Sequence, residues 1–373
     1  MKTIIVGGGI MGLSLAWAMA SAGQTVELFE QAPLPNPLAS SMDEHRLIRH
    51  PYGDHIGYAR MIDDAYAAWD LMWRDLGRSY YAPTGTLALT GNDADWATRS
   101  AASLASIGRP MTELSLAELP HRFPMIDAKG VQKAYWLDTG GTLFAQDIVT
   151  ALVQHLRRNP KVTLRSETEV RSVDLDAGRI VTADGAIYDA DAVVVAAGSW
   201  VVRLLPDIAS RLVPSRQVVV YFSLPDAARA AWSKGPMVLD LAGSVGLYLV
   251  PPMAGRGMKV GDHEFSRVGD PDAPREATAS EMTPLLDRCR SLLRGFDSWQ
   301  IDRLKVCFYT VTDDERFIVE KAGGKGWVMS PCSGHGFKFG ALMGRELSRT
   351  IVDGRDAATH ARWAAGLAGE AST

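Results

Sequence analysis

The N-terminal segment contains the feature that most restricts how this chain can fold. A short β-branched run at 3–6 predicts a buried strand, and an Ala-, Leu- and Met-rich stretch at 13–22 predicts a helix. Between them lies Gly-Gly-Gly-Ile-Met-Gly at 7–12, and a second predicted strand at 25–29 ends at Glu30. Strand, glycine turn, helix and acidic strand end together form a βαβ unit that is typical of dinucleotide binding.

The residue types of this unit each have a physical reason. Gly7 permits the tight turn, Gly9 lets the backbone approach a pyrophosphate, and Gly12 lets the helix pack closely against the strand. The first N–H groups of the helix then face the phosphates, and Glu30 accepts hydrogen bonds from a ribose. Taken alone, the motif does not distinguish NAD from FAD, and a glycine-rich turn without a ligand is the alternative.

Later strands that end in small residues predict that the nucleotide-binding domain is discontinuous. The run Asp-Ala-Val-Val-Val-Ala-Ala-Gly at 191–198 is either a plain core strand or a strand passing close to the cofactor, and its position downstream favours FAD. The stretch 162–187 predicts two or three strands. A last strand at 327–329 runs into a second glycine turn at 333–336, which opens a helix at 340–351.

These segments predict a mixed α/β (α+β) fold with two domains, as the length of 373 residues also suggests. An FAD-binding, Rossmann-like domain takes residues 1–79, 143–212 and 307–373. A substrate domain on a mixed β-sheet takes residues 80–142 and 213–306, where strand-like and helical patterns alternate.

Composition excludes several function classes. A net charge of -4 argues against a nucleic-acid partner. The three cysteines at 289, 307 and 332 cannot form a disulfide framework or a zinc pair, so we expect no metal and a cytoplasmic location. The N-terminal segment resembles a signal peptide that ends at 20–22, but the dinucleotide motif explains this segment better. No other stretch is apolar enough for a membrane helix, so we expect no membrane partner.

Five further segments carry a resemblance that covers nearly the whole chain. They are Arg-Leu-Ile-Arg-His-Pro-Tyr-Gly at 46–53, Gly-Met-Lys-Val-Gly-Asp-His at 257–263, Lys-Val-Cys-Phe-Tyr-Thr at 305–310, Asp-Asp-Glu at 313–315 and Ser-Gly-His-Gly-Phe-Lys-Phe at 333–339. In order and spacing the chain resembles the monomeric sarcosine oxidase and N-methyltryptophan oxidase family. The resemblance implies the fold of the D-amino-acid-oxidase-like flavoproteins, in which a mixed sheet of the substrate domain covers the flavin.

The resemblance also implies a reaction, that of an FAD-dependent oxidase acting on CH–NH donors. Such an enzyme oxidises the C–N bond of a secondary or N-methyl α-amino acid, sarcosine-like or cyclic, to an imine and reduces O2 to H2O2. Its partners are a small amino acid and O2, and we expect a monomer. The alternative is an FAD-binding subunit of an amino-acid dehydrogenase that passes electrons to a protein or quinone. The substrate side chain stays open, because sequence does not give pocket volume.

Several cofactor contacts are implied by the same resemblance. Cys307 corresponds to the cysteine that holds the flavin covalently, Arg46 lies near the flavin, and Gly334 and Gly336 belong to the flavin-contacting turn. Taken by itself, Cys307 is equally an inert buried thiol, because Lys305 two residues away does not activate it.

Three cations are implied at the reacting end of the site. Lys259 corresponds to the oxygen-activating lysine, whose positive charge stabilises the superoxide formed on electron transfer to O2, as an oxyanion hole stabilises an oxyanion. A solvated lysine on an edge strand is the alternative. Arg49 and Lys338 correspond to the pair that binds the substrate carboxylate, one as a bidentate fork and the other as a point charge. A surface ion pair for Arg49 and a solvated lysine for Lys338 are the alternatives.

Three further side chains complete the implied catalytic set. Tyr309 and Tyr248 map onto active-site aromatic residues, and His263 onto a histidine that flanks them. Each is also compatible with a core position, and Leu247 is an alternative to Tyr248 because the preceding loop is difficult to align.

One short segment departs from the family pattern. The family has Ser-His-Gly shortly before its paired arginines, whereas this chain has Met42 and Asp43 in place of the histidine and glycine. An added carboxylate is expected to alter contacts on one face of the flavin and to repel phosphates. His45 could supply the missing imidazole from a shifted register.

Overall fold

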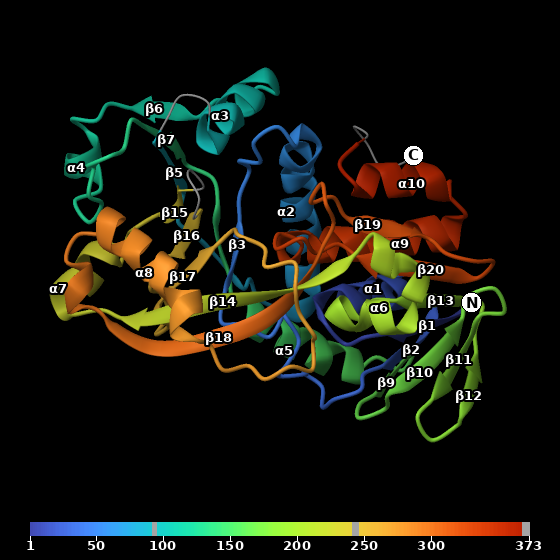
Figure 1. Ribbon diagram of the computed structural model, residues 1–373. Helices are drawn as coiled ribbons and strands as arrows, with labels where there is room; N and C mark the ends of the chain where they lie inside the picture. Colours follow the sequence, from blue (N-terminus) through green and yellow to red (C-terminus); the bar gives the residue numbers. More distant parts are fainter. Residues whose placement is uncertain (92–94, 241–245, 368–373) are drawn as a thin grey trace.

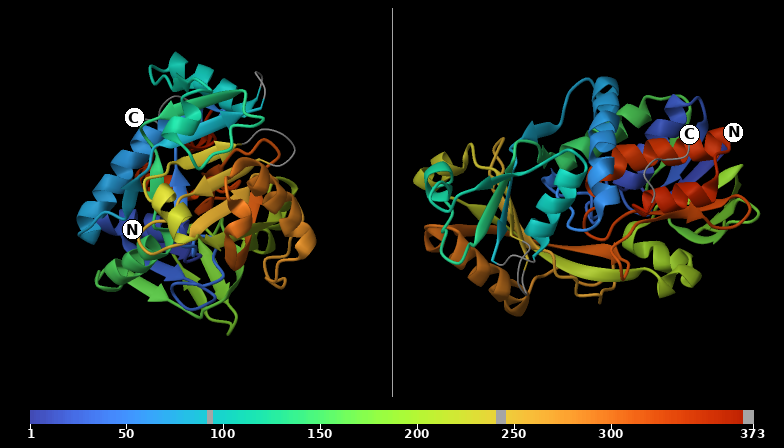
Figure 2. Two further views of the ribbon diagram at one scale, coloured as in Figure 1. Left: turned by 90° about the vertical axis from the view of Figure 1, so that its left-hand side faces the viewer. Right: turned by 90° about the horizontal axis from the view of Figure 1, so that it is seen from above.

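The structure is a computed structural model, and it describes residues 1–91, 95–240 and 246–367. Two large sheets lie toward opposite ends of the molecule (Figure 1), and the turned views show the same separation (Figure 2). The long strands β14 and β18 reach from one end toward the other. None of the helices in the described ranges is long and apolar enough to cross a membrane.

The first sheet contains the predicted βαβ unit and has six strands in the order β19-β20-β13-β1-β2-β9. Its members pair in parallel except for the edge strand β19, which is antiparallel. The strands are β1 (Lys2–Val6), β2 (Thr25–Phe29), β9 (Val162–Arg165), β13 (Ala192–Val195), β19 (Ile318–Lys321) and β20 (Gly326–Ser330). The strands predicted at the N-terminus, at 191–198 and at 327–329 are therefore confirmed.

The stretch that begins with β9 contains more than the parallel sheet. Three strands, β9, β10 (Val170–Asp174) and β11 (Arg179–Thr182), lie within 162–187 as predicted, and a further strand, β12 (Ile187–Asp189), begins at its last residue; β10, β11 and β12 form a separate antiparallel sheet. The first and last of these strands are largely exposed, with burial patterns that lack a full apolar face. Such strands leave only a weak alternation signal in the sequence.

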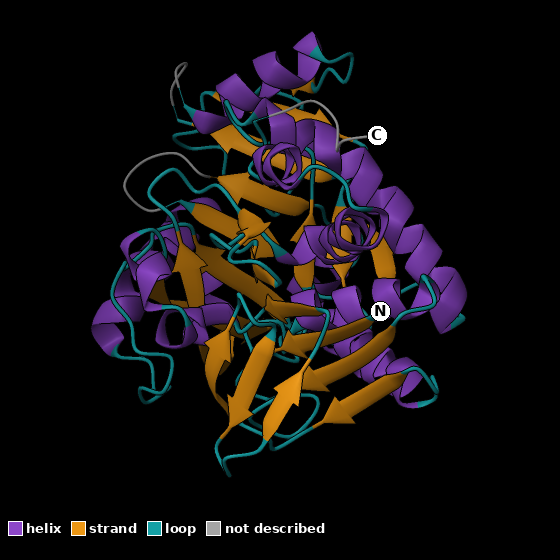
Figure 3. Ribbon diagram, turned by 90° about the vertical axis from the view of Figure 1, so that its right-hand side faces the viewer, coloured by secondary structure: helices purple, strands orange, loops and turns teal. Residues whose placement is uncertain are grey.

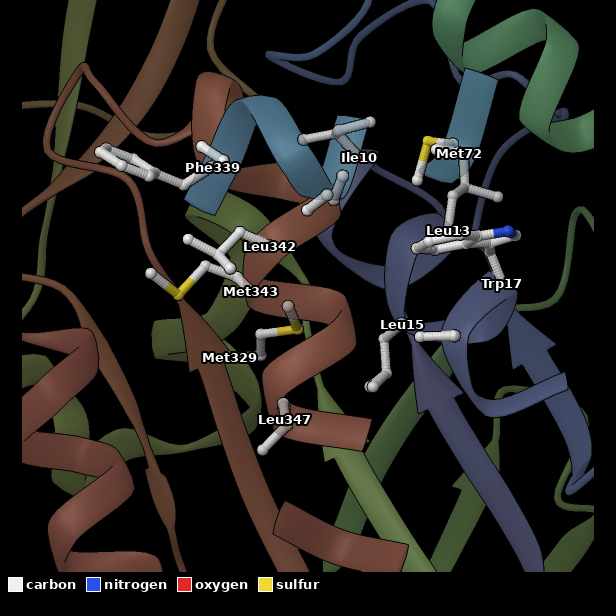
Figure 4. Packing of buried hydrophobic residues seen from close by; sticks show 14 of the residues in the cluster. Ile10, Leu13, Leu15, Trp17, Met72, Met329, Phe339, Leu342, Met343 and Leu347 are labelled. Carbon is white, nitrogen blue, oxygen red and sulfur yellow. The ribbon is translucent and has the colours of Figure 1, made fainter. Parts of the chain in front are cut away.

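Helices pack against the first sheet, and Figure 3 shows several of them running alongside the strands. The helix α1 (Ile10–Ser21) is buried nearly all round, and α9 (Gly340–Asp353) packs directly against it. A Cβ at Gly344 would lie 2.5 Å from the carbonyl carbon of Ser14, so glycine is what permits this approach. Figure 4 shows the resulting core, in which Leu13 and Trp17 of α1 lie near Met72, while Leu342, Met343 and Leu347 of α9 lie on the other side of the view.

The remaining helices lie around the two sheets. They are α2 (Ile56–Leu76), α3 (Trp96–Ser106), α4 (Leu119–Arg122), α5 (Ala145–Arg157), α6 (Val201–Leu204), α7 (Asp226–Trp232), α8 (Ala279–Leu292) and α10 (Ala357–Ala364). The helix α9 confirms the C-terminal helix predicted at 340–351.

The second large sheet is mixed and has eight strands in the order β18-β14-β17-β16-β15-β5-β7-β6. A small fourth sheet has the order β3-β8-β4, and Figure 1 shows β3 between the two large sheets. The strands are β3 (Arg46–Ile48), β4 (Tyr81–Pro83), β5 (Thr86–Thr90), β6 (Thr112–Leu114), β7 (Lys133–Leu137), β8 (Gly141–Leu143), β14 (Val213–Ser223), β15 (Met237–Asp240), β16 (Leu247–Val250), β17 (Met258–Asp262) and β18 (Gln300–Val311).

The division into two domains stays a prediction. The eight-stranded sheet draws its strands from both segments assigned to the substrate domain. The proposed boundary between 306 and 307 falls inside β18, so this strand would belong to both domains.

Candidate active site

A single cavity extends from the N-terminal glycine turn to the eight-stranded sheet. Its lining includes Gly7, Glu30, Arg46, Lys259 and Lys338, which come from both sheets and from the loops between them. Most of the residues predicted from the sequence are thus brought together, although they lie hundreds of positions apart in the chain, whereas Gly12 and Cys307 do not line the cavity.

The glycine turn leaves no room for larger residues at two of its positions. Gly7 has a φ of 114°, and a Cβ at Gly12 would lie 1.9 Å from the Gly7 carbonyl oxygen. At Gly9, by contrast, the nearest atom to an added Cβ is the Ser41 Oγ at 3.4 Å. Gly9 lines the cavity and is not crowded by the protein, which leaves ligand approach as the reason for glycine there.

Glu30 ends the strand beside this turn and is 5% exposed. Its carboxylate accepts hydrogen bonds from the backbone N–H of Gly8 at 2.8 Å and of Ala32 at 3.0 Å, and from Asn36 Nδ2 at 3.0 Å. Burial raises the pKa of Glu30, and these donors oppose the rise. The acid therefore lines the cavity in a fixed position, as a ribose-binding residue requires.

These residues fit a dinucleotide such as FAD. The first turn of α1 lines the cavity at Gly9, Ile10 and Met11, and the N-cap Gly9 has no side-chain cap. Backbone N–H groups at a helix N-terminus bind phosphate, and the glycine turn supplies the space. When bound, FAD would supply a two-electron, hydride-accepting ring.

The second glycine turn is built in the same way. Gly334 has a φ of 74°, and a Cβ at Gly336 would lie 1.7 Å from the Pro331 carbonyl oxygen. Both glycines line the cavity, as their predicted role in flavin contact requires, and the role itself stays a prediction.

Arg49 and Lys338 line the cavity and are 7% and 4% exposed, so neither solvent-exposed alternative holds. Arg49 donates to the Pro51 carbonyl and lies over the Tyr52 ring, 4.5 Å from its centroid. Lys338 Nζ donates to Tyr52 Oη at 3.1 Å and to the His335 carbonyl at 2.9 Å. No carboxylate in the described ranges forms an ion pair with either cation.

The electrostatics of this pair favour an anionic ligand. Burial, followed by repulsion from Arg49 and Arg46, holds the pKa of Lys338 well below its usual range. Burial also lowers the pKa of Arg49. Two buried cations that share one cavity and form no ion pair with a carboxylate in the described ranges favour a negatively charged ligand.

Lys259 has a different environment. It lies on β17, between β14 and β16, and is 1% exposed, so the solvated edge-strand alternative is wrong. Its Nζ donates to Asp43 Oδ2 at 2.5 Å and to the His45 carbonyl at 3.2 Å. Burial first, and then Arg46, lower the pKa of Lys259 to about 8, while Asp43 opposes this shift.

Asp43 collects four donors on one buried carboxylate. Besides Lys259, Oδ2 accepts from Arg46, while Oδ1 accepts from the Tyr221 hydroxyl and from the Glu44 N–H at 3.0 Å. Burial alone would raise the pKa of Asp43, but Arg46 and Lys259 hold it well below its usual range.

This arrangement corrects the expectation of an unneutralised carboxylate against the cofactor. Asp43 and His45 are buried and are not among the residues that line the cavity. His45 Nε2 instead lies 3.3 Å from the Gly257 carbonyl oxygen, and its ring stacks on Tyr221. The imidazole expected from a shifted register does not reach the cavity wall.

The aromatic residues of the predicted set are placed at the wall. Tyr248, Tyr309 and His263 all line the cavity, whereas Leu247 packs in the core of the eight-stranded sheet. Burial raises the pKa of both tyrosines, so their hydroxyls stay protonated and can donate. His263 Nε2 lies 3.2 Å from Glu315 Oε2.

Cys307 is buried on β18 and does not itself line the cavity. It packs with Tyr309 and Val311, and Cys332, which does line the cavity, packs against the same cluster. Burial raises the pKa of the Cys307 thiol, and Arg46 opposes the rise. Covalent attachment of a flavin at this position stays a prediction.

Sequence reasoning missed several members of the site. Tyr52, which contacts both Arg49 and Lys338, lies three residues after Arg49, so its position in the segment could have identified it. Tyr221 and Cys332 gave no signal, because one lies within an apolar strand and the other was one of three scattered cysteines.

Comparison with known proteins agrees with this geometry. The family described as FAD dependent oxidoreductase matches residues 2–350. The chain belongs to this family. Its FAD-binding fold and its dependence on FAD follow from that membership together with the glycine turn and Glu30.

Within the FAD dependent oxidoreductase family, the chain is similar to named oxidases. It is 28% identical to a monomeric sarcosine oxidase of Bacillus sp. (strain B-0618), covering 94% of this chain and 92% of that one. It is 25% identical to an N-methyl-L-tryptophan oxidase of Yersinia pestis (strain Pestoides F), covering 91% and 92%. The resemblance found in the sequence is thereby confirmed.

Solved structures share the fold. NikD, an unusual amino acid oxidase essential for nikkomycin biosynthesis, superposes with a TM-score of 0.80 at 20% identity over 95% of this chain and 94% of that one. L-proline dehydrogenase from P. horikoshii gives a TM-score of 0.81 at 20% identity over 98% and 96%. These likenesses confirm the mixed α/β architecture.

Proposed function

We propose that this chain is an FAD-dependent amine oxidase that oxidises the C–N bond of a secondary or N-methyl α-amino acid. The product is an imine, and the two electrons and two protons removed from the substrate reduce O2 to H2O2. The named relatives, a sarcosine oxidase and an N-methyl-L-tryptophan oxidase, support this substrate class.

One observation supports the substrate class from the chain itself. Arg49 and Lys338 are buried cations on the wall of the same cavity as the dinucleotide turn, and they lack a carboxylate partner in the described ranges. An α-carboxylate supplies the missing charge and fixes the Cα–N bond relative to the rest of the site.

The other wall residues have separate roles in the proposal. Tyr248 and Tyr309, whose hydroxyls stay protonated, donate hydrogen bonds to the substrate, and His263 flanks them. Lys259 provides the cation that favours electron transfer to O2. Arg46, which donates to Asp43 and lines the cavity, lies near the flavin in this proposal.

We extend the proposal to the form of the protein. FAD is attached through Cys307, residues 1–79, 143–212 and 307–373 form the FAD domain, and the remainder forms the substrate domain. The protein acts as a cytoplasmic monomer on a small amino acid and O2.

A second candidate follows from the pairing of Lys259 with Asp43. A lysine that is already paired is a weaker aid to O2 reduction, which favours a dehydrogenase that passes electrons to a protein or quinone acceptor. This candidate keeps the carboxylate site and changes only the electron acceptor.

The experiment is a screen of the purified protein with N-methyl and cyclic amino acids. H2O2 release and O2 consumption are followed in parallel with reduction of an artificial electron acceptor in the absence of O2. Peroxide formed at the rate of substrate loss supports the oxidase, and turnover only with the artificial acceptor supports the dehydrogenase. Turnover of an amine without a carboxylate at equal rate would contradict the proposed substrate class.

A further inference from the structure

The cavity has two pairs of buried cations in unlike electrostatic environments. Arg49 and Lys338 have no ion-pair partner in the described ranges, whereas Lys259 and Arg46 share the carboxylate of Asp43. Both pairs line the cavity, but Asp43 does not, so the acid lies behind the cations it neutralises.

We infer that Asp43 is a positioning residue for Lys259. Asp43 holds the Lys259 ammonium at the cavity wall in its charged form and compensates its charge. The flavin therefore faces an ion pair and not a lone cation. The inference rests on the proposed function, because it takes Lys259 as the residue beside the flavin.

The hydrogen bonds of Asp43 fix its position from several elements. Its oxygens accept from Arg46 on β3, from Lys259 on β17 and from Tyr221 on β14, and its side chain is 1% exposed. A carboxylate with donors on both oxygens cannot rotate without breaking several hydrogen bonds, so the ammonium it binds is fixed as well.

Asp43 is also the counter-charge that Lys259 requires. The ammonium faces His45 from the loop before β3, Arg46, Tyr248 from β16 and Cys307 from β18, while Tyr221 from β14 and Lys305 from β18 act on Asp43. These are cations or groups that stay neutral, because burial lowers the pKa of the histidine to about 3 and raises the pKa of both tyrosines and the thiol.

The consequence for the charge of Lys259 has a definite sign. Burial and Arg46 lower its pKa, while Asp43 and its hydrogen bond raise it, to the net value of about 8. The ammonium is therefore charged below about pH 8 and is lost as the pH rises through that value. Without Asp43 the two largest influences that raise the pKa of Lys259 are lost, and the amine becomes neutral at lower pH.

The test is a pH titration of the visible absorption spectrum of the bound flavin. In the unaltered protein we expect a transition near pH 8, and Lys259→Met should remove it. Asp43→Asn should move the midpoint down by roughly 1–3 pH units, which is the usual effect of an adjacent opposite charge. The reduction potential of the flavin, measured across the same pH range, should change its slope at the same midpoints.

Glu44→Gln provides the matched control. Glu44 neighbours Asp43 in sequence but pairs with the exposed Arg303, so its loss should leave the midpoint unchanged. A midpoint that moves in Asp43→Asn and not in Glu44→Gln supports the inference. An unmoved midpoint in Asp43→Asn, or equal shifts in both variants, overturns it.

The remaining outcomes separate this inference from the proposed function. A flavin-containing, active protein that lacks any Lys259-dependent transition overturns the inference and leaves the proposed function standing. A protein that binds no FAD overturns the proposed function, and the inference falls with it.

Should Asp43→Asn fail to fold, the double variant Asp43→Asn/Lys259→Met decides. If it folds, the unpaired ammonium caused the failure, as the inference requires. If it also fails, Asp43 is needed for other reasons and the inference is wrong.

Discussion

Loss of Lys338 should weaken the binding of simple carboxylates while leaving neutral analogues unaffected. In the structure Lys338 and Arg49 are both buried at the cavity wall, and their partners are a tyrosine hydroxyl and backbone carbonyls. Neither Lys338 nor Arg49 forms an ion pair within the described ranges, so a bound carboxylate would supply an anionic partner to both. We therefore expect Lys338→Met and Arg49→Lys to raise the Kd for acetate or methylthioacetate.

The magnitude follows from the type of contact. A hydrogen bond to a charged group contributes about 1.5–3 kcal/mol, and each 1.4 kcal/mol is about a factor of ten in Kd. Lys338→Met removes one such contact and should raise Kd roughly 10- to 150-fold. Arg49→Lys keeps the charge but loses the planar fork, so its effect should lie at the lower end of this range.

The binding should also depend on pH. Because the pKa of Lys338 is held well below its usual range, the residue is neutral above that pKa in the unliganded protein. A bound carboxylate favours the charged form of Lys338, so above this pKa the binding of a carboxylate is accompanied by the uptake of a proton. The affinity should therefore fall by up to about tenfold per pH unit as the pH rises. Lys338→Met should abolish both the proton uptake and this slope.

Calorimetric titration in two buffers of different ionisation enthalpy measures Kd and proton uptake together. Methyl acetate is the neutral ligand control, and Arg256→Gln is the control variant, because Arg256 is paired with Asp147. Unchanged carboxylate affinity in Lys338→Met, or an equal loss for methyl acetate, would refute the reasoning.

Three further predictions concern the cofactor and oxygen. Cys307→Ser should release all FAD on denaturing electrophoresis, while Cys332→Ser should keep a fluorescent band; the reverse would place the attachment at the second thiol. Lys259→Met should slow reoxidation of the reduced enzyme about 10²–10³-fold in stopped flow, with anaerobic reduction by substrate nearly unchanged, and an equal loss in both would make the lysine structural. Gly12→Ala should lower both FAD content and melting temperature, because the added Cβ would lie 1.9 Å from a carbonyl oxygen. Gly9→Ala should lower FAD content alone, and equal melting temperatures in the two variants would contradict this prediction.

The local elements of the fold could be predicted because each is encoded within a few neighbouring residues. The strand, the turn and the helix from Lys2 to Ser21 follow from β-branched residues, glycines at fixed spacing and a helix-forming run. The resemblance of five short segments then identified the residues of the candidate site, since the motifs survive at identities of 25–28%.

The electrostatic environment of each site residue was decided by the tertiary structure. Sequence marked Asp43 as a departure and expected it to repel the cofactor, but it could not show that Lys259, 216 positions away, would meet it. That contact depends on the register between β14 and β17 and on the path of the loop before β3, which no local pattern specifies. Lys338 and Lys259 are both buried lysines in glycine-containing segments, yet only folding leaves the first without a carboxylate in the described ranges and pairs the second, because a counter-charge acts through space and not along the chain.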